Sequence, residues 1–179
     1  KLVNPIKGYP LLVLADSTND LQLAESLLIA ADNTGADAQL IIKPRSAPRM
    51  ATKPGPILSE AFKKAKYIIS ICDDGFDASQ AIREATSNGT RVLITKVDGI
   101  EDYILRAILD VDIDTMIKNA HICSELWEST KICRVTCPNG TDISFNLRPR
   151  KCIIGDGALT KDGEIDFFPG AQVNIAPVE

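Results

Sequence analysis

Three side chains that could bind a ligand lie close together in the last residues of the chain. Gln172, Asn174 and Glu179 supply two amides and one carboxylate within an otherwise apolar segment. Two prolines and a glycine in the same segment predict a kinked, extended backbone and not a helix. We interpret this segment as the beginning of a polar site. Because Glu179 is also the last residue, we expect the sequence to be part of a longer protein.

The chain has a single histidine, His121, in a stretch whose apolar residues recur with helical spacing. A lone histidine on a helix is more often structural than catalytic, and both interpretations stay open at this point. The single tryptophan, Trp127, follows on the same stretch and is expected to pack the helix against the core.

The five cysteines do not form a metal-binding or disulfide pattern. Their spacing is irregular and all but Cys137 lie in apolar runs, which favours reduced, buried thiols in a cytoplasmic protein. Cys133 and Cys137 would point to one face of a strand, but no second pair of Cys or His accompanies them. A zinc site at these residues is therefore the weaker interpretation. The cysteines are Cys72, Cys123, Cys133, Cys137 and Cys152.

Composition excludes some classes of partner. The chain has 20 Lys and Arg against 24 Asp and Glu, and no basic run stands out, which argues against nucleic-acid binding. Its apolar stretches are short and broken by polar residues, so we predict no transmembrane helix. With 45% hydrophobic residues, the 179-residue chain can bury a sizeable core. We therefore expect neither nucleic acid nor a membrane as a partner.

Apolar runs of strand length alternate with helical patterns in the first part of the chain. This alternation predicts an α/β fold with a doubly wound parallel sheet, of the Rossmann or flavodoxin-like type, over residues 1–98. The predicted strands are Pro10–Ala15, Ala38–Lys43, Tyr67–Cys72 and Arg91–Thr95, and the helices begin near Leu21, Ile57 and Ala78.

Polar residues follow three of the predicted strands, at the sheet edge where such folds place ligands. They occupy residues 16–18, 73–75 and 96–99. None of these turns matches a dinucleotide-binding or phosphate-binding glycine motif, so a nucleotide site is poorly supported. Helix capping is the alternative role for the acidic residues. The proline-rich residues 44–56 are either a functional loop or a surface excursion.

The remaining chain is predicted to form a long helical connection and a β-rich second part. Residues 99–130 have helical spacing, with a possible break at Asp110–Asp112. Lys131–Cys137 and Asp142–Leu147 alternate like two strands around a turn and predict a hairpin. We interpret residues 131–179 as the incomplete beginning of a β-rich domain.

Three stretches resemble a known group of metalloenzymes. Leu105–Asp112, Val135–Phe145 and Phe168–Glu179 are similar to segments of the aminopeptidase T and aminopeptidase S group. They are still more similar to the relatives of that group known as 2,5-dihydroxypyridine 5,6-dioxygenases. Together with the α/β order, the resemblance covers nearly the whole chain.

The resemblance implies a metal site near the end of this sequence. Where the peptidases have a metal-binding glutamate, this chain has Gln172, a poor ligand for a divalent cation. Glu179 matches the dioxygenase-like pattern, so the resemblance implies that it binds the metal; an ordinary surface acid is the alternative. Gln172 and Asn174 then become candidates for the substrate pocket. The remaining ligands are expected beyond residue 179, and the chain by itself is expected to be inactive.

Three functions follow from this reading. The first is an Fe(II)-dependent ring-cleaving dioxygenase of the 2,5-dihydroxypyridine type, in the catabolism of aromatic compounds. The alternative is a Zn-, Co- or Mn-dependent hydrolase, such as a leucyl aminopeptidase or an aromatic-ring aminohydrolase. A further alternative is a non-enzymatic α/β binding module. The resemblance also implies a small-molecule substrate and a homo-oligomer.

Overall fold

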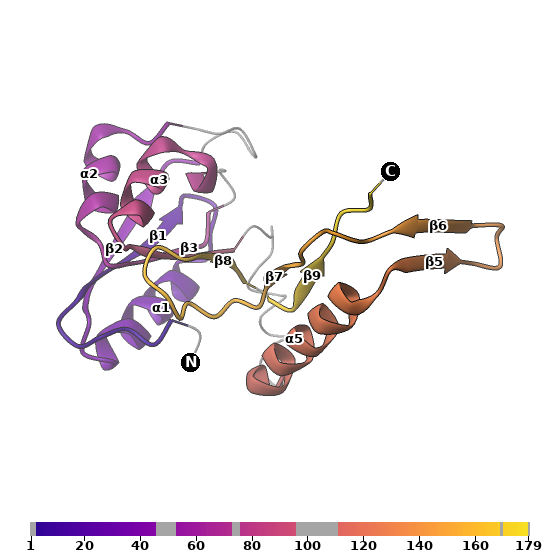
Figure 1. Cartoon of the computed structure of the whole chain (residues 1–179). Coiled ribbons are helices and arrows are strands. Elements are labelled where there is room, and N and C mark those ends of the chain that lie inside the picture. The colour runs from indigo at the N-terminus through magenta and orange to yellow at the C-terminus, as the bar shows by residue number, and fades with distance from the viewer. Residues whose placement is uncertain (1–2, 46–52, 73–75, 96–110, 169, 179) are drawn as a thin grey trace. The chain divides into compact units, whose positions relative to one another are not determined.

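The structure is a computed structural model that describes residues 3–45, 53–72, 76–95, 111–168 and 170–178 (Figure 1). The chain divides into two compact units, which are described separately. Unit 1 comprises residues 1–110 and 157–169, and unit 2 comprises residues 111–156 and 170–179. Among the described residues, no helix is long and apolar enough to cross a membrane.

Unit 1 is built on a parallel sheet of five strands in the order β2-β1-β3-β4-β8. Its helices are α1, α2 and α3, with the short 3-10 helix η1 before α3 (Figure 1). The predicted α/β class and parallel sheet are thereby confirmed. The strands are β1 Pro10–Asp16, β2 Asp37–Lys43, β3 Tyr67–Ser70, β4 Arg91–Ile94 and β8 Ile165–Phe167; the helices are α1 Leu21–Asn33, α2 Pro56–Lys64, η1 Phe76–Ala78 and α3 Gln80–Ser87.

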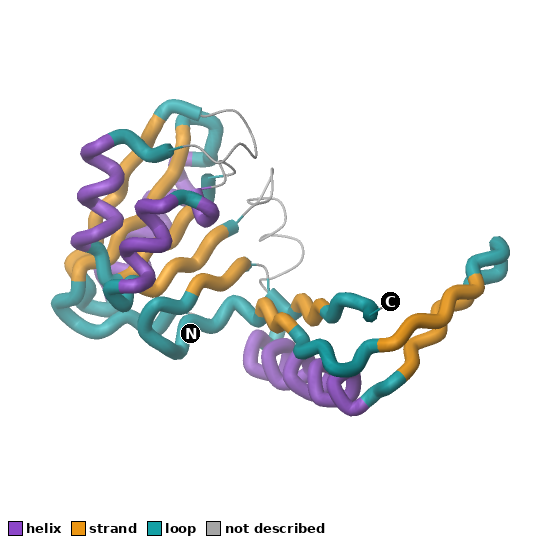
Figure 2. The backbone as a smooth tube through the Cα atoms, turned by 45° about the horizontal axis from the view of Figure 1, so that its top comes forward, coloured by secondary structure: helices purple, strands orange, loops and turns teal. Residues whose placement is uncertain are grey.

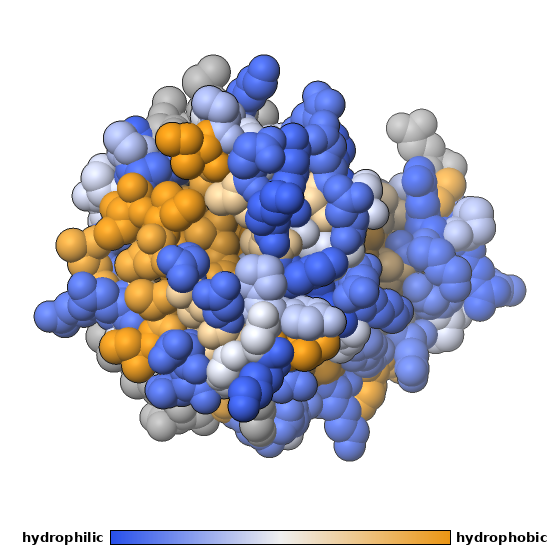
Figure 3. All heavy atoms as spheres, turned by 90° about the vertical axis from the view of Figure 1, so that its left-hand side faces the viewer, coloured by the Kyte–Doolittle hydropathy of each residue, from blue (hydrophilic) through white to orange (hydrophobic). Residues whose placement is uncertain are grey.

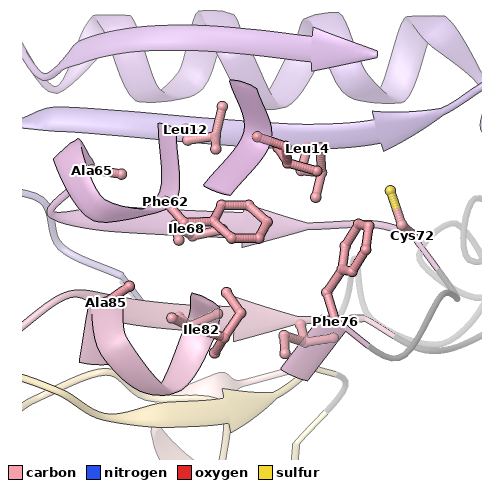
Figure 4. Close-up of a cluster of buried hydrophobic side chains, with 12 residues drawn as sticks. Leu12, Leu14, Phe62, Ala65, Ile68, Cys72, Phe76, Ile82 and Ala85 are labelled. Carbon is pink, nitrogen blue, oxygen red and sulfur yellow. The ribbon is translucent and has the colours of Figure 1, made fainter. Parts of the chain in front are cut away.

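Alternate residues of β1, which lies between β2 and β3, face opposite layers of unit 1. Leu12 and Leu14 lie in a buried cluster with side chains of α2 and α3, whereas Leu11 and Val13 lie in a cluster with α1 and β4 residues. Figure 4 shows the first cluster, in which the rings of Phe62 and Phe76 meet edge to face at 6.0 Å. A strand buried on both faces explains why the sequence of β1 is continuously apolar.

Side-chain caps define where two of the helices in unit 1 begin. The Asp20 carboxylate accepts a hydrogen bond from the Gln22 amide at the start of α1. The Ser79 hydroxyl accepts one from the Ile82 amide at the start of α3. These bonds satisfy amide groups that have no partner within the helix.

Strand β8 joins the sheet from a distant part of the sequence. The sequence pattern grouped these residues with the strands of the second part, yet β8 pairs in parallel with β4. The preceding turn is anchored by Arg91, whose guanidinium donates to the Asp162 carboxylate at 3.0 Å. The same turn requires Gly163, because a Cβ there would lie 2.6 Å from the Thr86 carbonyl oxygen. The sequence of β8 has no strong strand pattern, and the contacts of the preceding turn position it beside β4.

In its described residues, unit 2 consists of one helix and two pairs of antiparallel strands. Helix α5 (Ile113–Ser129) leads into the predicted hairpin, which is confirmed as β5 (Ile132–Thr136) and β6 (Asp142–Asn146). The second pair is β7 (Ile153–Gly155) with β9 (Gln172–Asn174). Figure 1 and Figure 2 both show the β7–β9 strand pair beside α5.

Several sequence predictions fall outside the described residues. They concern the polar strand ends at 73–75 and 96–99, most of the proline-rich stretch, and the first part of the predicted long helix. The described second part of that helix is α5.

Candidate functional site

Gln172 and Asn174 lie on β9 and project from the face that is turned away from α5. The intervening residue, Val173, lines a cavity together with side chains of α5. Because side chains alternate along a strand, Gln172 and Asn174 lie on the opposite face. Both are exposed, and neither side-chain amide has a hydrogen-bond partner within the part of the chain that the structure describes. Two amides on one face are thus available to a ligand.

The neighbouring strand adds an apolar side chain and an open space to this face. Asn174 pairs with Ile153, whose side chain is 72% exposed, and Gln172 pairs with Gly155, which has no side chain. An amide can donate and accept hydrogen bonds, and an exposed isoleucine can cover an apolar ring. This face, made of Ile153, Gly155, Gln172 and Asn174, is referred to below as the amide face. Its chemistry suits a flat ligand with polar substituents.

On the other side of β9, Ala171 and Val173 line a broadly open pocket of about 660 Å³ together with side chains of α5 and the residues just before it. This volume is within the range of small-molecule pockets, about 300–1,000 Å³. Its wall is mostly apolar, with Asp112, Thr115 and Asn119 at one end. Trp127, which the sequence predicted to pack against the core, lies half-buried in this wall. The apolar lining residues include Met116, Ala120, Cys123, Trp127, Ala171 and Val173.

His121 contacts a carboxylate at the end of β7. Its Nε2 lies 3.0 Å from Oδ2 of Asp156. The histidine side chain is 55% exposed, whereas the Asp156 side chain is only 15% exposed. The pair therefore joins α5 to the chain that follows β7, on the side of the strand pair away from the amide face. This geometry agrees with the structural interpretation of His121.

A second polar contact holds α5 against the residues before β7. The Glu128 carboxylate accepts from the Lys151 ammonium at 3.0 Å and from the Cys152 amide at 3.1 Å. These two hydrogen bonds, the ammonium first, hold the pKa of Glu128 below its ordinary value. The Cys152 thiol also lies 3.7 Å from the Ser124 carbonyl oxygen. These contacts hold the residues just before β7 against the second half of α5.

The polar residues after β1 shape a turn. The buried Asp16 carboxylate accepts from the amide and the hydroxyl of Thr18, at 2.8 and 2.6 Å. Asn19 accepts from the Asp16 amide and donates to the Ile71 carbonyl oxygen. These bonds favour a structural role for this strand end over ligand binding.

The described residues do not assemble a metal centre. Among them there is no group of three or more His, Cys, Asp or Glu side chains that could hold a metal ion. His121 and Asp156 supply two such groups, and the amides of Gln172 and Asn174 are poor ligands for a divalent cation. Glu179, the predicted ligand, lies outside the described residues. Of the predicted motif 105–112, only Val111 and Asp112 are described, and Asp112 caps α5.

Sequence reasoning proposed the two amides as candidates for a substrate pocket, which stays a prediction, and it did not predict which residues surround them. Ile153 and Gly155 belong to the amide face because of the register between β7 and β9. In the sequence they lie far from Gln172 and Asn174, so their spacing does not indicate this proximity. Nothing in the spacing of His121 and Asp156 indicates their contact.

Comparison with known proteins supplies the remaining information. A family model described as NicX, 2,5-dihydroxypyridine 5,6-dioxygenase, matches residues 4–179. The structure is similar to that of the 2,5-dihydroxypyridine dioxygenase from Pseudomonas putida KT2440, with 17% sequence identity and a TM-score of 0.69. The similarity covers 96% of this chain and 51% of the other, so this chain spans about half the length of that dioxygenase. At this identity the similarity shows a shared fold. No curated protein matches the chain.

Proposed function

Because this chain belongs to the family of 2,5-dihydroxypyridine 5,6-dioxygenases, we propose that it forms part of an enzyme that opens a hydroxylated pyridine ring with O2. The observation that carries the proposal is the family match, which extends over residues 4–179. The similar fold of the solved dioxygenase supports it. The activity is assigned to the whole enzyme, of which this chain corresponds to about half.

In this proposal the amide face contributes to the substrate pocket. A dihydroxylated pyridine is flat, with hydroxyl groups and a ring nitrogen at its rim. The amides of Gln172 and Asn174 can hydrogen-bond such groups, and the exposed Ile153 can lie against the ring. The absence of any competing side-chain partner for the two amides among the described residues supports this role.

The cofactor in this proposal is Fe(II), with Glu179 as a ligand from this chain. Iron of this type is commonly held by two histidines and a carboxylate, with positions open for substrate and O2. The described residues do not supply such a set, so the other ligands must come from polypeptide outside them. The role of this chain would then be to position one carboxylate and the substrate.

Several finer predictions stay proposals. They are the relationship to the aminopeptidase T and S group, a homo-oligomer, a cytoplasmic location, and the division into residues 1–98, 99–130 and an incomplete β-rich domain from residue 131. The hydrolase and the non-enzymatic module remain as outcomes of the experiment below.

The test uses the full-length protein purified without oxygen. We expect about one iron per subunit, and loss of the ultraviolet absorbance of 2,5-dihydroxypyridine only after O2 is admitted. Zinc, cobalt or manganese, with release of an amino acid from a peptide amide and no oxygen uptake, would instead establish the hydrolase. If the purified protein contained no bound metal, the result would favour the non-enzymatic binding module.

Substitutions separate the two proposed roles. Glu179→Ala is expected to abolish iron binding. Asn174→Leu is expected to retain iron and to raise KM about tenfold, since loss of one hydrogen bond to a bound ligand costs about 1–2 kcal/mol. Ser144→Ala, at another exposed polar residue of unit 2, is the matched control and should change neither value. Unchanged iron content in Glu179→Ala would reject this residue as a ligand.

A further inference from the structure

Among the residues that the structure describes, strand β2 is the outermost strand of the sheet in unit 1, with a strand neighbour on one side only. Backbone hydrogen bonds show which of its residues face β1. The Asp37 amide donates to the Tyr9 carbonyl oxygen, and the Lys43 carbonyl oxygen accepts from the Ser17 amide. Because backbone groups alternate along a strand, the amides and carbonyls of Ala38, Leu40 and Ile42 point to the open edge.

The edge carries apolar side chains as well as open backbone groups. Ala38 and Leu40 pack on the α1 side of the sheet, and Ile42, on the same face by alternation, is 48% exposed. Leu23 and Leu27 of α1 pack around Leu40 and remain half-buried. Figure 3, which views unit 1 from the left of Figure 1, shows hydrophobic side chains gathered on part of this side. A long apolar edge of this kind is normally covered, because it would otherwise pair with another chain.

We propose that the open edge of β2 pairs with β2 of a second copy of this chain, in antiparallel orientation about a two-fold axis at Leu40. In this register Leu40 lies opposite its counterpart, and Ala38 lies opposite Ile42 of the other copy. The backbone amides and carbonyls of Ala38, Leu40 and Ile42, which point to the open edge, then face the same groups of the other copy. The sheet continues from one copy into the next through hydrogen-bonded pairs, and the α1 helices of the two copies lie on the same face.

The charges at the ends of β2 are complementary in this register. Asp37 and Lys43 are the first and last residues of the strand, so the two-fold axis places each carboxylate opposite a lysine of the other copy. Lys43 lies over the Phe76 ring and donates to the Pro44 carbonyl oxygen, but an ammonium group has three N–H donors and can also donate to a carboxylate. Parallel pairing of the copies would instead put like charges opposite each other. The ends of the strand therefore favour the antiparallel register.

The surface area that the proposed β2–β2 interface would bury agrees with a dimer of moderate affinity. Seven residues span about 24 Å at ~3.4 Å per residue. With the sheet and helix layers about 20 Å deep, each copy covers about 500 Å², so the total is close to the ~1,000 Å² that a specific interface requires. We therefore expect a dissociation constant in the micromolar range.

The first test is the mass of the 179-residue chain in solution, measured by light scattering between about 1 and 100 μM, a range that brackets micromolar dissociation constants. We expect a shift from monomer to dimer across this range. Ile42→Lys is expected to weaken the dimer at least tenfold. Ile143→Lys, at a comparably exposed isoleucine of the β5–β6 hairpin, is the matched control and should leave it unchanged.

The second test reverses the charges. Asp37→Lys alone is expected to weaken the dimer, and Asp37→Lys combined with Lys43→Asp should restore it, because the swap recreates both opposite-charge pairs. Restoration would not follow from a merely structural effect within one copy. A chain that stays monomeric up to about 100 μM, well above a micromolar constant, would overturn the proposal. So would a dimer that Ile143→Lys dissociates and Ile42→Lys does not.

Discussion

The parallel sheet of unit 1 and the β5–β6 hairpin of unit 2 hold their side chains in opposite environments. In β1, every residue after Pro10 is buried, because layers of side chains cover both faces of the strand. In the hairpin no residue is buried. One face of the hairpin carries Cys133, Val135, Ile143 and Phe145, and the other carries the ion pair of Arg134 with Asp142. The two regions therefore differ in how much side-chain packing can hold their strands.

This difference implies different sources of stability. The sheet is held by a packed core, in which each fully buried aliphatic or aromatic side chain contributes about 1.5–3 kcal/mol. The hairpin depends on its turn, its cross-strand pairs and its ladder of hydrogen bonds, and an isolated hairpin is at best marginally stable. The same kind of substitution should therefore cost far more in unit 1 than in the hairpin.

The largest effect is expected from removing one ring in each region. Phe62 is fully buried, so Phe62→Ala should destabilise unit 1 by about 3–5 kcal/mol. Phe145 is half-buried on the hairpin, so Phe145→Ala should cost less than about 1 kcal/mol. Hydrogen exchange followed separately in β1 and in β6 measures the two losses. Equal losses would mean that the hairpin is packed as firmly as the sheet.

A smaller contrast is expected between two glycines with positive φ. At Gly163 an added Cβ would meet the Thr86 carbonyl oxygen, whereas at Gly140, in the hairpin turn, nothing lies within 4 Å. Gly140→Ala should cost only the backbone strain, about 1–2 kcal/mol. Gly163→Ala should cost more, because the turn that anchors β8 must move.

Amide exchange in β8 and in β6 checks this contrast. Faster exchange of β8 in Gly163→Ala, with β6 unaffected, is the expected result. If the two glycine variants were equally stable, the close approach to Thr86 would not constrain the turn.

The same two regions show what sequence reasoning could predict. The continuous apolar run Pro10–Ala15 predicted β1, since only a strand covered on both faces tolerates it. The alternation around the turn at Pro138–Thr141 predicted the hairpin. Nothing local indicated that Ile165–Phe167 would pair with β4, because that pairing depends on a distant turn.

In the candidate site, too, some residues could be proposed from the sequence and others could not. Gln172 and Asn174 could be identified from residue type and spacing, because polar side chains in an apolar, extended segment are conspicuous. Their neighbours Ile153 and Gly155 come from strand register, and the cavity beside Trp127 comes from the packing of α5 on β9. Both depend on tertiary structure. Glu179 lies outside the described residues, and its role stays a prediction.

A modest, pH-dependent effect is expected where α5 meets the strands of unit 2. Hydrogen bonds to Lys151 and Cys152 hold the pKa of Glu128 below the ordinary value of 4.5. A carboxyl group whose pKa is lower in the folded state stabilises that state above its unfolded pKa. This contribution is therefore complete above about pH 4.5 and is lost as the pH falls through the lowered folded pKa. Because the group is exposed, we expect the effect to be small.

Exchange of the Cys152 amide, which donates to Glu128, measures this loss directly. Protection of the amide should decrease as the pH falls below 4.5, after correction for the intrinsic exchange rate. Glu128→Gln retains an acceptor but cannot titrate, so its protection should not change in this range. The same acid dependence in both variants would assign the loss to another group.

The smallest effect on the fold, and the most direct chemical contrast between the regions, is expected at two cysteines. Cys137 is exposed at the hairpin turn, and Cys72 is buried in unit 1. The Thr141 hydroxyl, followed by the amides of Thr141 and Asn139, lowers the pKa of the Cys137 thiol from its ordinary value of 9.0. The thiolate is the reactive form, so Cys137 should be alkylated first and should keep its reactivity at lower pH than an ordinary thiol.

Mass spectrometry of chains treated with iodoacetamide measures both rates. Thr141→Val removes the hydroxyl and should slow the reaction at Cys137 roughly several-fold, because a higher pKa leaves less thiolate at neutral pH. Phe62→Ala should accelerate the reaction at Cys72, since both residues belong to one buried cluster, and should leave Cys137 unchanged. If Phe62→Ala accelerated both cysteines equally, the hairpin would unfold together with the sheet, and the two regions would not differ in the way their burial indicates.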